Sequence, residues 1–199
     1  MRSLLAFLIC LFSVASFAQE SHLKITPAEP APLLKLYLLD FEMRYEKGSD
    51  LEWVERKPLN LAVAFQKKQF DFVMEYARFT ASSGNATLNI DREHQEIMAW
   101  GRWHFASTHV SEALWSLYGG LGVGGYEEKV TTHTPGSSQT DNGGMQWMSG
   151  LSVGVETQIP ITGSLGFVGA LEGRVLTAAD FEPNPLGSGV LRLGLFLNL

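Results

Sequence analysis

One short motif, His109-Val110-Ser111 followed by Glu112, contains the residue types that hydrolysis by a serine nucleophile needs. A serine hydroxyl becomes a nucleophile when a histidine takes its proton and an acid orients that histidine. The tripeptide also falls in a segment that we expect to be a short polar turn, and two residues can meet this spacing by chance. We therefore interpret the motif as a turn and keep His109 and Ser111 as an alternative catalytic pair.

The other residues that could bind a metal or a phosphate lack the spacing these ligands require. His94, His104 and His133 do not follow a metal-ligand pattern. The run from Gly119 to Gly125 resembles a phosphate loop only in its glycines, because it has neither the lysine nor the strand-to-helix context. The sequence therefore predicts no metal site and no cofactor.

Charged residues instead recur inside segments that are otherwise apolar. If these segments cross a membrane, an Arg or Lys that faces lipid near the middle costs about 2–4 kcal/mol. An unpaired charge inside the protein is costly as well. We therefore expect ion pairs in the interior, made by Asp40, Glu42, Arg44, Asp71, Glu75, Arg102, Glu156, Glu172, Arg174 and Arg192.

Strands are the elements that must position these charges, because apolar and polar residues alternate with a period of two. After the first eighteen residues, no stretch approaches the length of apolar sequence that a membrane-spanning helix needs. The clearest alternation closes the chain, where Leu191, Leu193, Leu195, Leu197 and Leu199 are separated by Arg192, Gly194, Phe196 and Asn198. The other expected strands span residues 34–46, 59–66, 70–79, 93–105, 113–127, 145–156 and 164–177.

The two faces of these strands differ in a way that favours a membrane. One face is bulky and apolar, with aromatic residues toward the segment ends, where membrane barrels carry aromatic girdles: Tyr37, Tyr45, Trp103, Phe105, Trp115 and Trp147. The other face mixes charges of both signs with Gly, Ala and Ser, which suits a narrow interior. A soluble secreted β-barrel or sandwich, in which the apolar face would point inward, remains the alternative.

The connections between the strands alternate in length. Residues 47–58, 80–92, 128–144 and 178–189 are long, whereas the connections near Lys67, near Ser107 and at 157–162 are short. This alternation is typical of an even-stranded outer-membrane barrel with both termini on the periplasmic side. It predicts eight strands, with ten as the alternative, and closure beside the first strand would pair Arg192 with Asp40 or Glu42, near Glu172. We expect 128–144 to be a flexible polar loop that, with 47–58, contacts external ligands.

The start of the chain predicts export. Arg2, the apolar run Leu4–Val14 and the small residues that end at Ala18 form a secretory signal peptide, residues 1–18. Its cleavage would remove Cys10, the only cysteine of the chain, and so leave no thiol chemistry. We expect residues 19–33 to be a periplasmic lead-in and residues 34–199 to form one barrel domain. The net charge of −6 argues against nucleic acid as a partner.

This layout resembles the OmpA-type and related eight-stranded outer-membrane β-barrels of Gram-negative cells. The last strand resembles their C-terminal assembly signal, although Leu199 stands where an aromatic residue is usual. The resemblance implies contact with outer-membrane lipid and lipopolysaccharide, insertion by the barrel-assembly machinery, and a non-enzymatic structural or surface-interaction role. The alternatives are a barrel that modifies lipid A in the manner of the deacylases, through His109 and Ser111, and a small gated channel. The external ligand stays unknown.

Overall fold

The structure, a computed structural model, describes residues 32–45, 53–54, 59–84, 89–179 and 185–199. The expected signal peptide, most of the lead-in and much of the expected connections 47–58 and 178–189 lie outside these residues. Over the described ranges, no helix has the length and apolar character to cross a membrane. The strands are β1 (Leu33–Tyr45), β2 (Trp53–Val54), β3 (Leu59–Lys67), β4 (Phe70–Gly84), β5 (Asn89–Val110), β6 (Ala113–Thr134), β7 (Ser137–Pro160), β8 (Leu165–Ala178) and β9 (Leu186–Asn198).

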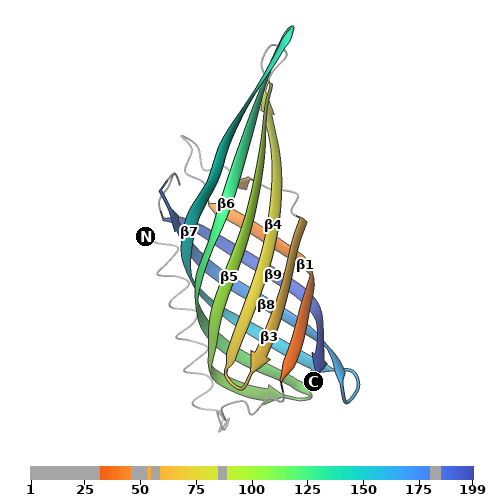
Figure 1. Cartoon of the computed structure of the whole chain (residues 1–199). Coiled ribbons are helices and arrows are strands. Elements are labelled where there is room, and N and C mark those ends of the chain that lie inside the picture. The colour runs from red at the N-terminus through yellow and green to blue at the C-terminus, as the bar shows by residue number, and fades with distance from the viewer. Residues whose placement is uncertain (1–31, 46–52, 55–58, 85–88, 180–184) are drawn as a thin grey trace.

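Eight of the nine strands form a closed antiparallel ring (Figure 1). They follow one another in chain order, and β9 closes the ring by pairing with β1 from Leu33↔Asn198 to Tyr45↔Gly187. The two-residue β2 only pairs with the end of β1. The predicted all-β, eight-stranded antiparallel barrel is therefore confirmed.

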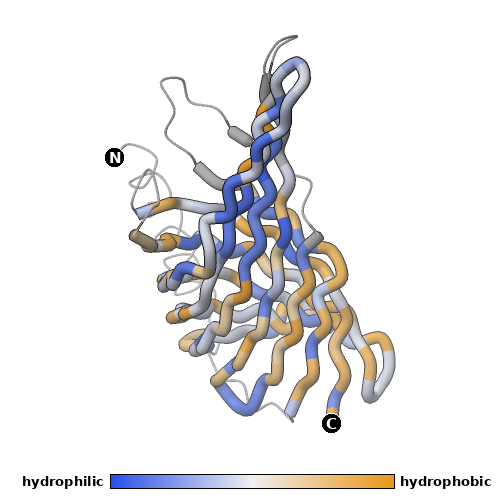
Figure 2. The backbone as a smooth tube through the Cα atoms, turned by 45° about the horizontal axis from the view of Figure 1, so that its top comes forward, coloured by the Kyte–Doolittle hydropathy of each residue, from blue (hydrophilic) through white to orange (hydrophobic). Residues whose placement is uncertain are grey.

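The alternation of each strand places apolar side chains outside and polar ones inside. On β4, Phe70 and Phe72 are 64% and 55% exposed, whereas Asp71 between them is 2% exposed. The outward residues together form an apolar band around the barrel, which Figure 2 shows as orange segments in the lower part of the tube. This is the reverse of a soluble barrel, in which the apolar faces would fill the interior.

A β-bulge in β1 reverses one predicted orientation. The register between β1 and β9 shifts between Tyr37 and Leu39, and the neighbours Leu38 and Leu39 both face outward. Strict alternation along this strand puts Tyr37 on the same outer face as Leu39. That prediction is wrong, because Tyr37 is completely buried. The side chain of Tyr45 lies outside the described part. The other predicted outer aromatics are exposed: Trp103, Phe105, Trp115 and Trp147.

Three tight connections lie at one end of the barrel. The β3–β4 turn is Lys68–Gln69, the β5–β6 turn is Ser111–Glu112, and residues 161–164 join β7 to β8. Lys68 and Ser111 have φ values of 57° and 56°, the left-handed conformation of tight turns. The turn expected near Ser107 was misplaced, because a register shift after His104 lets β5 continue to Val110.

At the other end, β4, β5, β6 and β7 continue beyond the barrel as a paired sheet (Figure 1). We call residues 79–84, 89–95, 126–134 and 137–147 the projecting sheet. Its β6–β7 hairpin turns at Pro135-Gly136, where Gly136 has a φ of 92°, as at the third residue of a type II turn. The expectation of a loop over 128–144 was therefore wrong, and residues 80–84 and 89–92 are strand as well. The threonines of residues 128–144 favour strands.

Candidate functional site

The barrel interior collects the charges that the sequence analysis singled out. All of them whose side chains the structure describes are buried: Asp40, Glu42, Asp71, Glu75, Arg102, Glu156, Glu172, Arg174 and Arg192. The side chain of Arg44 lies outside the described part. His104, which the alternation around Arg102 places inside, is buried too, and Lys35, Glu96 and His94 are buried as well and were missed. Among these described interior side chains, seven carboxylates face four Lys and Arg residues, so each cation can serve several acids.

Arg192 lies at the centre of the interior ion pairs. Its Nε donates to Asp40 Oδ2 at 2.8 Å, so the structure brings β9 and β1 together through this pair. Its Nη2 lies 2.7 Å from Glu75 Oε1 on β4, three strands away around the ring, and its Nη1 lies 3.4 Å from Glu172 Oε2. One guanidinium therefore links strands β1, β4, β8 and β9.

Two further arginines share the carboxylate partners of Arg192, and we call these three arginines and their carboxylates the central layer. Arg174 donates through both terminal nitrogens to Glu75, at 3.0 and 2.7 Å, in the bidentate geometry that guanidinium and carboxylate groups favour. Its guanidinium also lies over the ring of Trp100, 4.6 Å from the centroid. Arg102 Nη2 donates to Glu172 Oε2 at 2.6 Å. These large side chains fill the interior of the barrel at this level.

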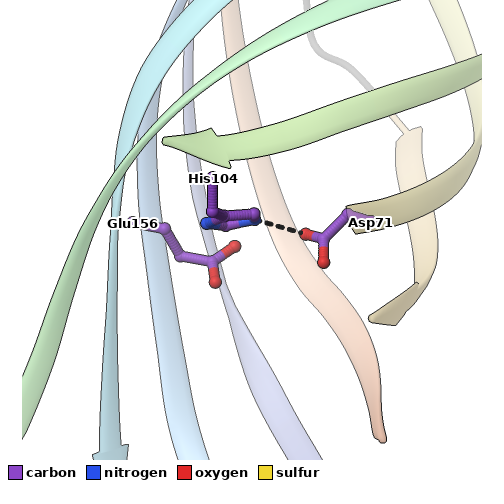
Figure 3. Close-up of side chains that lie close together, drawn as sticks. All are labelled: Asp71, His104 and Glu156. Carbon is purple, nitrogen blue, oxygen red and sulfur yellow. Dashed lines mark ion pairs between the residues drawn. The ribbon is translucent and has the colours of Figure 1, made fainter. Parts of the chain in front are cut away.

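A second cluster lies nearer the tight turns and has the residue types of a metal site (Figure 3). Carboxylate oxygens of Asp71 and Glu156 and a ring nitrogen of His104 lie within 4.8 Å of one another. Carboxylate and imidazole groups are common ligands of Zn²⁺. However, Lys35 Nζ lies 2.8 Å from Asp71 Oδ2 and 2.7 Å from Glu156 Oε1. The ammonium therefore already supplies the cation that these carboxylates require.

Neighbouring polar groups complete this lysine-centred cluster. Glu156 accepts a hydrogen bond from the Tyr37 hydroxyl at 2.8 Å and another from Gln158 at 2.8 Å. His104 Nε2 lies 3.1 Å from Asp71 Oδ2, and its Nδ1 lies 3.0 Å from Ser116 Oγ. We therefore interpret the cluster as a buried ion-pair plug. Asp71 and Glu156 were predicted to lie inside, whereas Lys35 and Tyr37 were missed, because the bulge in β1 reverses the facing that strict alternation gives these two residues.

The alternative catalytic pair lies outside the interior. His109 is the second-last residue of β5 and Ser111 lies in the β5–β6 turn, and both side chains are exposed. Acyl-transfer sites place the nucleophile, base and orienting acid where water is excluded. The position of His109 and Ser111 on an exposed turn does not favour that chemistry.

A ladder of side chains crosses the base of the projecting sheet. Phe79 on β4 lies 5.8 Å from the ring of His94 on β5, and His94 stacks on Tyr126 of β6 at 5.2 Å. The Tyr126 hydroxyl donates to Gln146 of β7 at 3.1 Å. Glu96 lies 3.0 Å from His94 Nε2. This ladder links all four strands of the sheet, and only the strand register could have revealed it.

The surface of the projecting sheet is polar. Cross-strand pairs include Arg78–Glu93 at 2.6 Å and His133–Asp91 at 3.0 Å. The hydroxyl groups of Thr131 and Thr140 lie 3.3 Å apart. Figure 2 shows this end of the tube mostly in blue and white, in contrast to the orange band below. The sheet therefore presents hydroxyl, amide and paired charged groups to water.

The last strand keeps the predicted alternation along most of its length. Leu191, Leu193 and Leu197 face outward, while Leu195 is half-buried. Leu199 is exposed, and its backbone N–H donates to the Pro32 carbonyl at 2.9 Å. Both ends of the described barrel therefore lie at the end with the tight turns.

Comparison with known proteins shows a shared fold at low sequence identity. No protein-family model matches the chain, and no curated protein sequence matches it significantly. Neisserial surface protein A superposes with a TM-score of 0.54 at 14% identity, over 84% of this chain and 96% of that one. Ail, the attachment invasion locus protein of Yersinia pestis, gives 0.47 at 16% identity, over 85% and 99%. The N-terminal β-barrel domain of Pseudomonas aeruginosa OprF gives 0.43 at 12% identity, over 85% and 98%.

Proposed function

We propose that the chain is an outer-membrane β-barrel that presents its projecting sheet outside the cell as a surface-interaction element. One observation carries this proposal. Strands β4 to β7 continue as a paired, polar sheet beyond the apolar band, whereas the other strands of the ring end near it. Rigid paired strands hold a binding surface better than loose loops do, because less conformational entropy is lost on binding.

The distribution of polarity supports placement in a membrane. Large apolar side chains cover the outside of the ring, and the arginines of the central layer are completely buried inside it. Trp103 and Trp115 lie on the outer face toward the tight turns, and Trp147 lies toward the projecting sheet. Interfacial tryptophans at both edges of an apolar band are typical of membrane barrels. The fold shared with Neisserial surface protein A agrees with this placement.

The filled interior supports a role other than catalysis inside the barrel or diffusion of solutes through it. Paired arginine and glutamate side chains occupy the central layer, and the lysine-centred cluster lies below it. An eight-stranded barrel leaves room for side chains and little else. We therefore propose that the interior stabilises the barrel and that the functional surface is outside. Lipopolysaccharide around the apolar band and the assembly machinery acting on β9 are the partners that this role implies.

Thiol labelling of intact cells tests the proposed placement. The Ser137→Cys variant carries its thiol at the tip of the projecting sheet, and Ser111→Cys carries it at the opposite end. In a Cys10→Ser background the introduced thiol is the only one in the chain. A membrane-impermeant maleimide should label Ser137→Cys on intact cells and Ser111→Cys only after the outer membrane is permeabilised. Equal labelling of both variants, or the reverse pattern, would contradict the proposal.

A further inference from the structure

Strand β7 has an open edge along the projecting sheet. One side of β7 pairs with β6 from Ser137 onward, but β8 joins the other side only at Met148. Between residues 137 and 145, the backbone groups that point away from β6 therefore have no strand partner within the described chain. Such an edge is a template for pairing with another strand. Within the described residues, β4 extends past its pairing with β3 over a shorter stretch, which ends at Gly84.

The upper part of this edge lacks the usual protection. Proteins commonly block an open edge with lysine, proline or a bulge. The stretch 137–142 contains no lysine and no proline, and Asp141 is its only charged residue. Its register with β6 is regular, and the shift between Glu127 and Lys129 comes below it. A straight, nearly neutral edge about 20 Å long is therefore available at about 3.4 Å per residue.

We propose that this edge pairs with the same edge of a second copy of the chain in a facing membrane. The proposal rests on the outer-membrane placement proposed above. In every copy, β7 runs from the tip of the projecting sheet toward the barrel. Two copies in one membrane would therefore bring their β7 edges together in parallel, with a two-fold axis along the strands. That symmetry places N–H opposite N–H and C=O opposite C=O, so no ladder forms.

In two copies that face each other from opposite membranes, the β7 strands run in opposite directions. Their β7 edges are antiparallel, and a two-fold axis perpendicular to the strands places each N–H opposite a C=O. With the axis at Thr140, Asp141 faces Gln139 and Ser138 faces Asn142, so like charges do not meet. The threonine pair Thr131–Thr140 already shows a hydroxyl contact of this kind within the sheet. Each copy thus offers an edge that complements itself.

Cysteine cross-linking between two cell populations tests this geometry. One population expresses the full chain with Ser138→Cys and the other with Asn142→Cys, both in the Cys10→Ser background. After mixing and mild oxidation, a disulfide-linked dimer should form between the two variants, and Thr140→Cys should dimerise with itself. Ser138→Cys alone and Asn142→Cys alone should give much less dimer. Absence of the mixed dimer, or equal cross-linking at every position, would overturn the proposal.

Charge variants give a second, independent readout. We expect cells with the unchanged chain to clump. Cells that express Thr140→Lys, and likewise Thr140→Glu cells, should not clump, because like charges then meet across the axis. Mixing the two variants should restore clumping. The control Thr80→Lys places the same charge on exposed β4 and should clump normally. Clumping of Thr140→Lys cells alone, or no clumping by the unchanged chain, would overturn the inference. The maleimide labelling would stand in either case, since it does not depend on pairing.

Discussion

Single side chains inside the barrel each serve several partners, and Arg192 shows the consequence most clearly. It contacts Asp40, Glu75 and Glu172, all of which are buried. Removal of one partner from a buried ion pair leaves uncompensated charge, which costs about 3–5 kcal/mol. The pairing with Asp40 could be derived from sequence, because barrel closure places β9 beside β1. The contact with Glu75 could not, since it depends on how far the guanidinium reaches across the interior.

The Arg192→Leu variant should therefore lower the free energy of unfolding by about 3–5 kcal/mol. Urea titration of the detergent-solubilised barrel, followed by gel mobility, measures this change. Arg92→Leu is the matched control, because Arg92 is exposed on the projecting sheet and its loss should cost under about 0.5 kcal/mol. Equal effects of the two substitutions would show that the central layer contributes little.

Lys35 offers a different test, because its ammonium contacts Asp71 and Glu156, two of the three residues whose spacing would suit a metal ion. In Lys35→Met, the carboxylates of Asp71 and Glu156 lose their cation, and we expect the barrel to be less stable. Addition of Zn²⁺ should then raise the thermal midpoint of Lys35→Met but not that of the unchanged protein.

The additional change His104→Gln in the Lys35→Met chain is the control, since it removes the imidazole ligand. The Zn²⁺ effect should disappear in this double variant. Stabilisation of the unchanged protein by Zn²⁺ would instead show that the metal can displace the lysine.

At the scale of the strand, the period-two pattern predicted both the strands and the facing of most residues. It failed where one extra residue enters a strand, as at Leu38, because a bulge shifts every residue beyond it to the other face. It also failed at the projecting sheet, where both faces are polar and the alternation of apolar residues disappears. The alternation arises because the two faces of a strand have different surroundings. A strand with water on both faces therefore does not show it.

Glycines of β6 show how tightly neighbouring strands fit inside the ring. A β-carbon at Gly122 would lie 2.6 Å from the indole of Trp100, whereas one at Gly101 would meet nothing within 4 Å. Gly122→Ala should therefore destabilise the barrel by about 1–3 kcal/mol through overpacking. Gly101→Ala, at an exposed position on the outside of the barrel, is the control and should be nearly neutral. The same urea titration compares the two, and a neutral Gly122→Ala would show that Trp100 can move aside.

At the scale of the molecule, the barrel and the projecting sheet are stabilised by different contacts. The sheet beyond the ladder of Phe79, His94 and Tyr126 packs against no second layer in the described chain, and its side chains are mostly exposed. The barrel holds the ion pairs and the closing contact between β1 and β9. We infer that the tip of the sheet can be changed without loss of the fold.

Deletion of residues 131–142 should therefore leave a folded barrel. The remaining segment from Glu128 to Gly144 can close as a short loop, because Gly143 and Gly144 follow the deletion and Gly144 already has a φ of 70°. The shortened protein should keep its change in gel mobility between unheated and boiled samples. Loss of that shift would show that the β6–β7 hairpin is needed for folding.

Closure of the ring has a consequence for how the protein is made. Asp40 and Arg192 lie on the two strands that come first and last in the barrel, so their contact exists only after the seam has formed. Until then, the sheet is curved but open. Part of its inner charges is then exposed to the lipid or water between the unpaired edges of β1 and β9. If the barrel lies in a membrane, as proposed above, lipid at that gap would be very costly, and we expect the nascent sheet to remain in contact with water until its edges meet. On that placement, enclosure of the charges would precede full insertion.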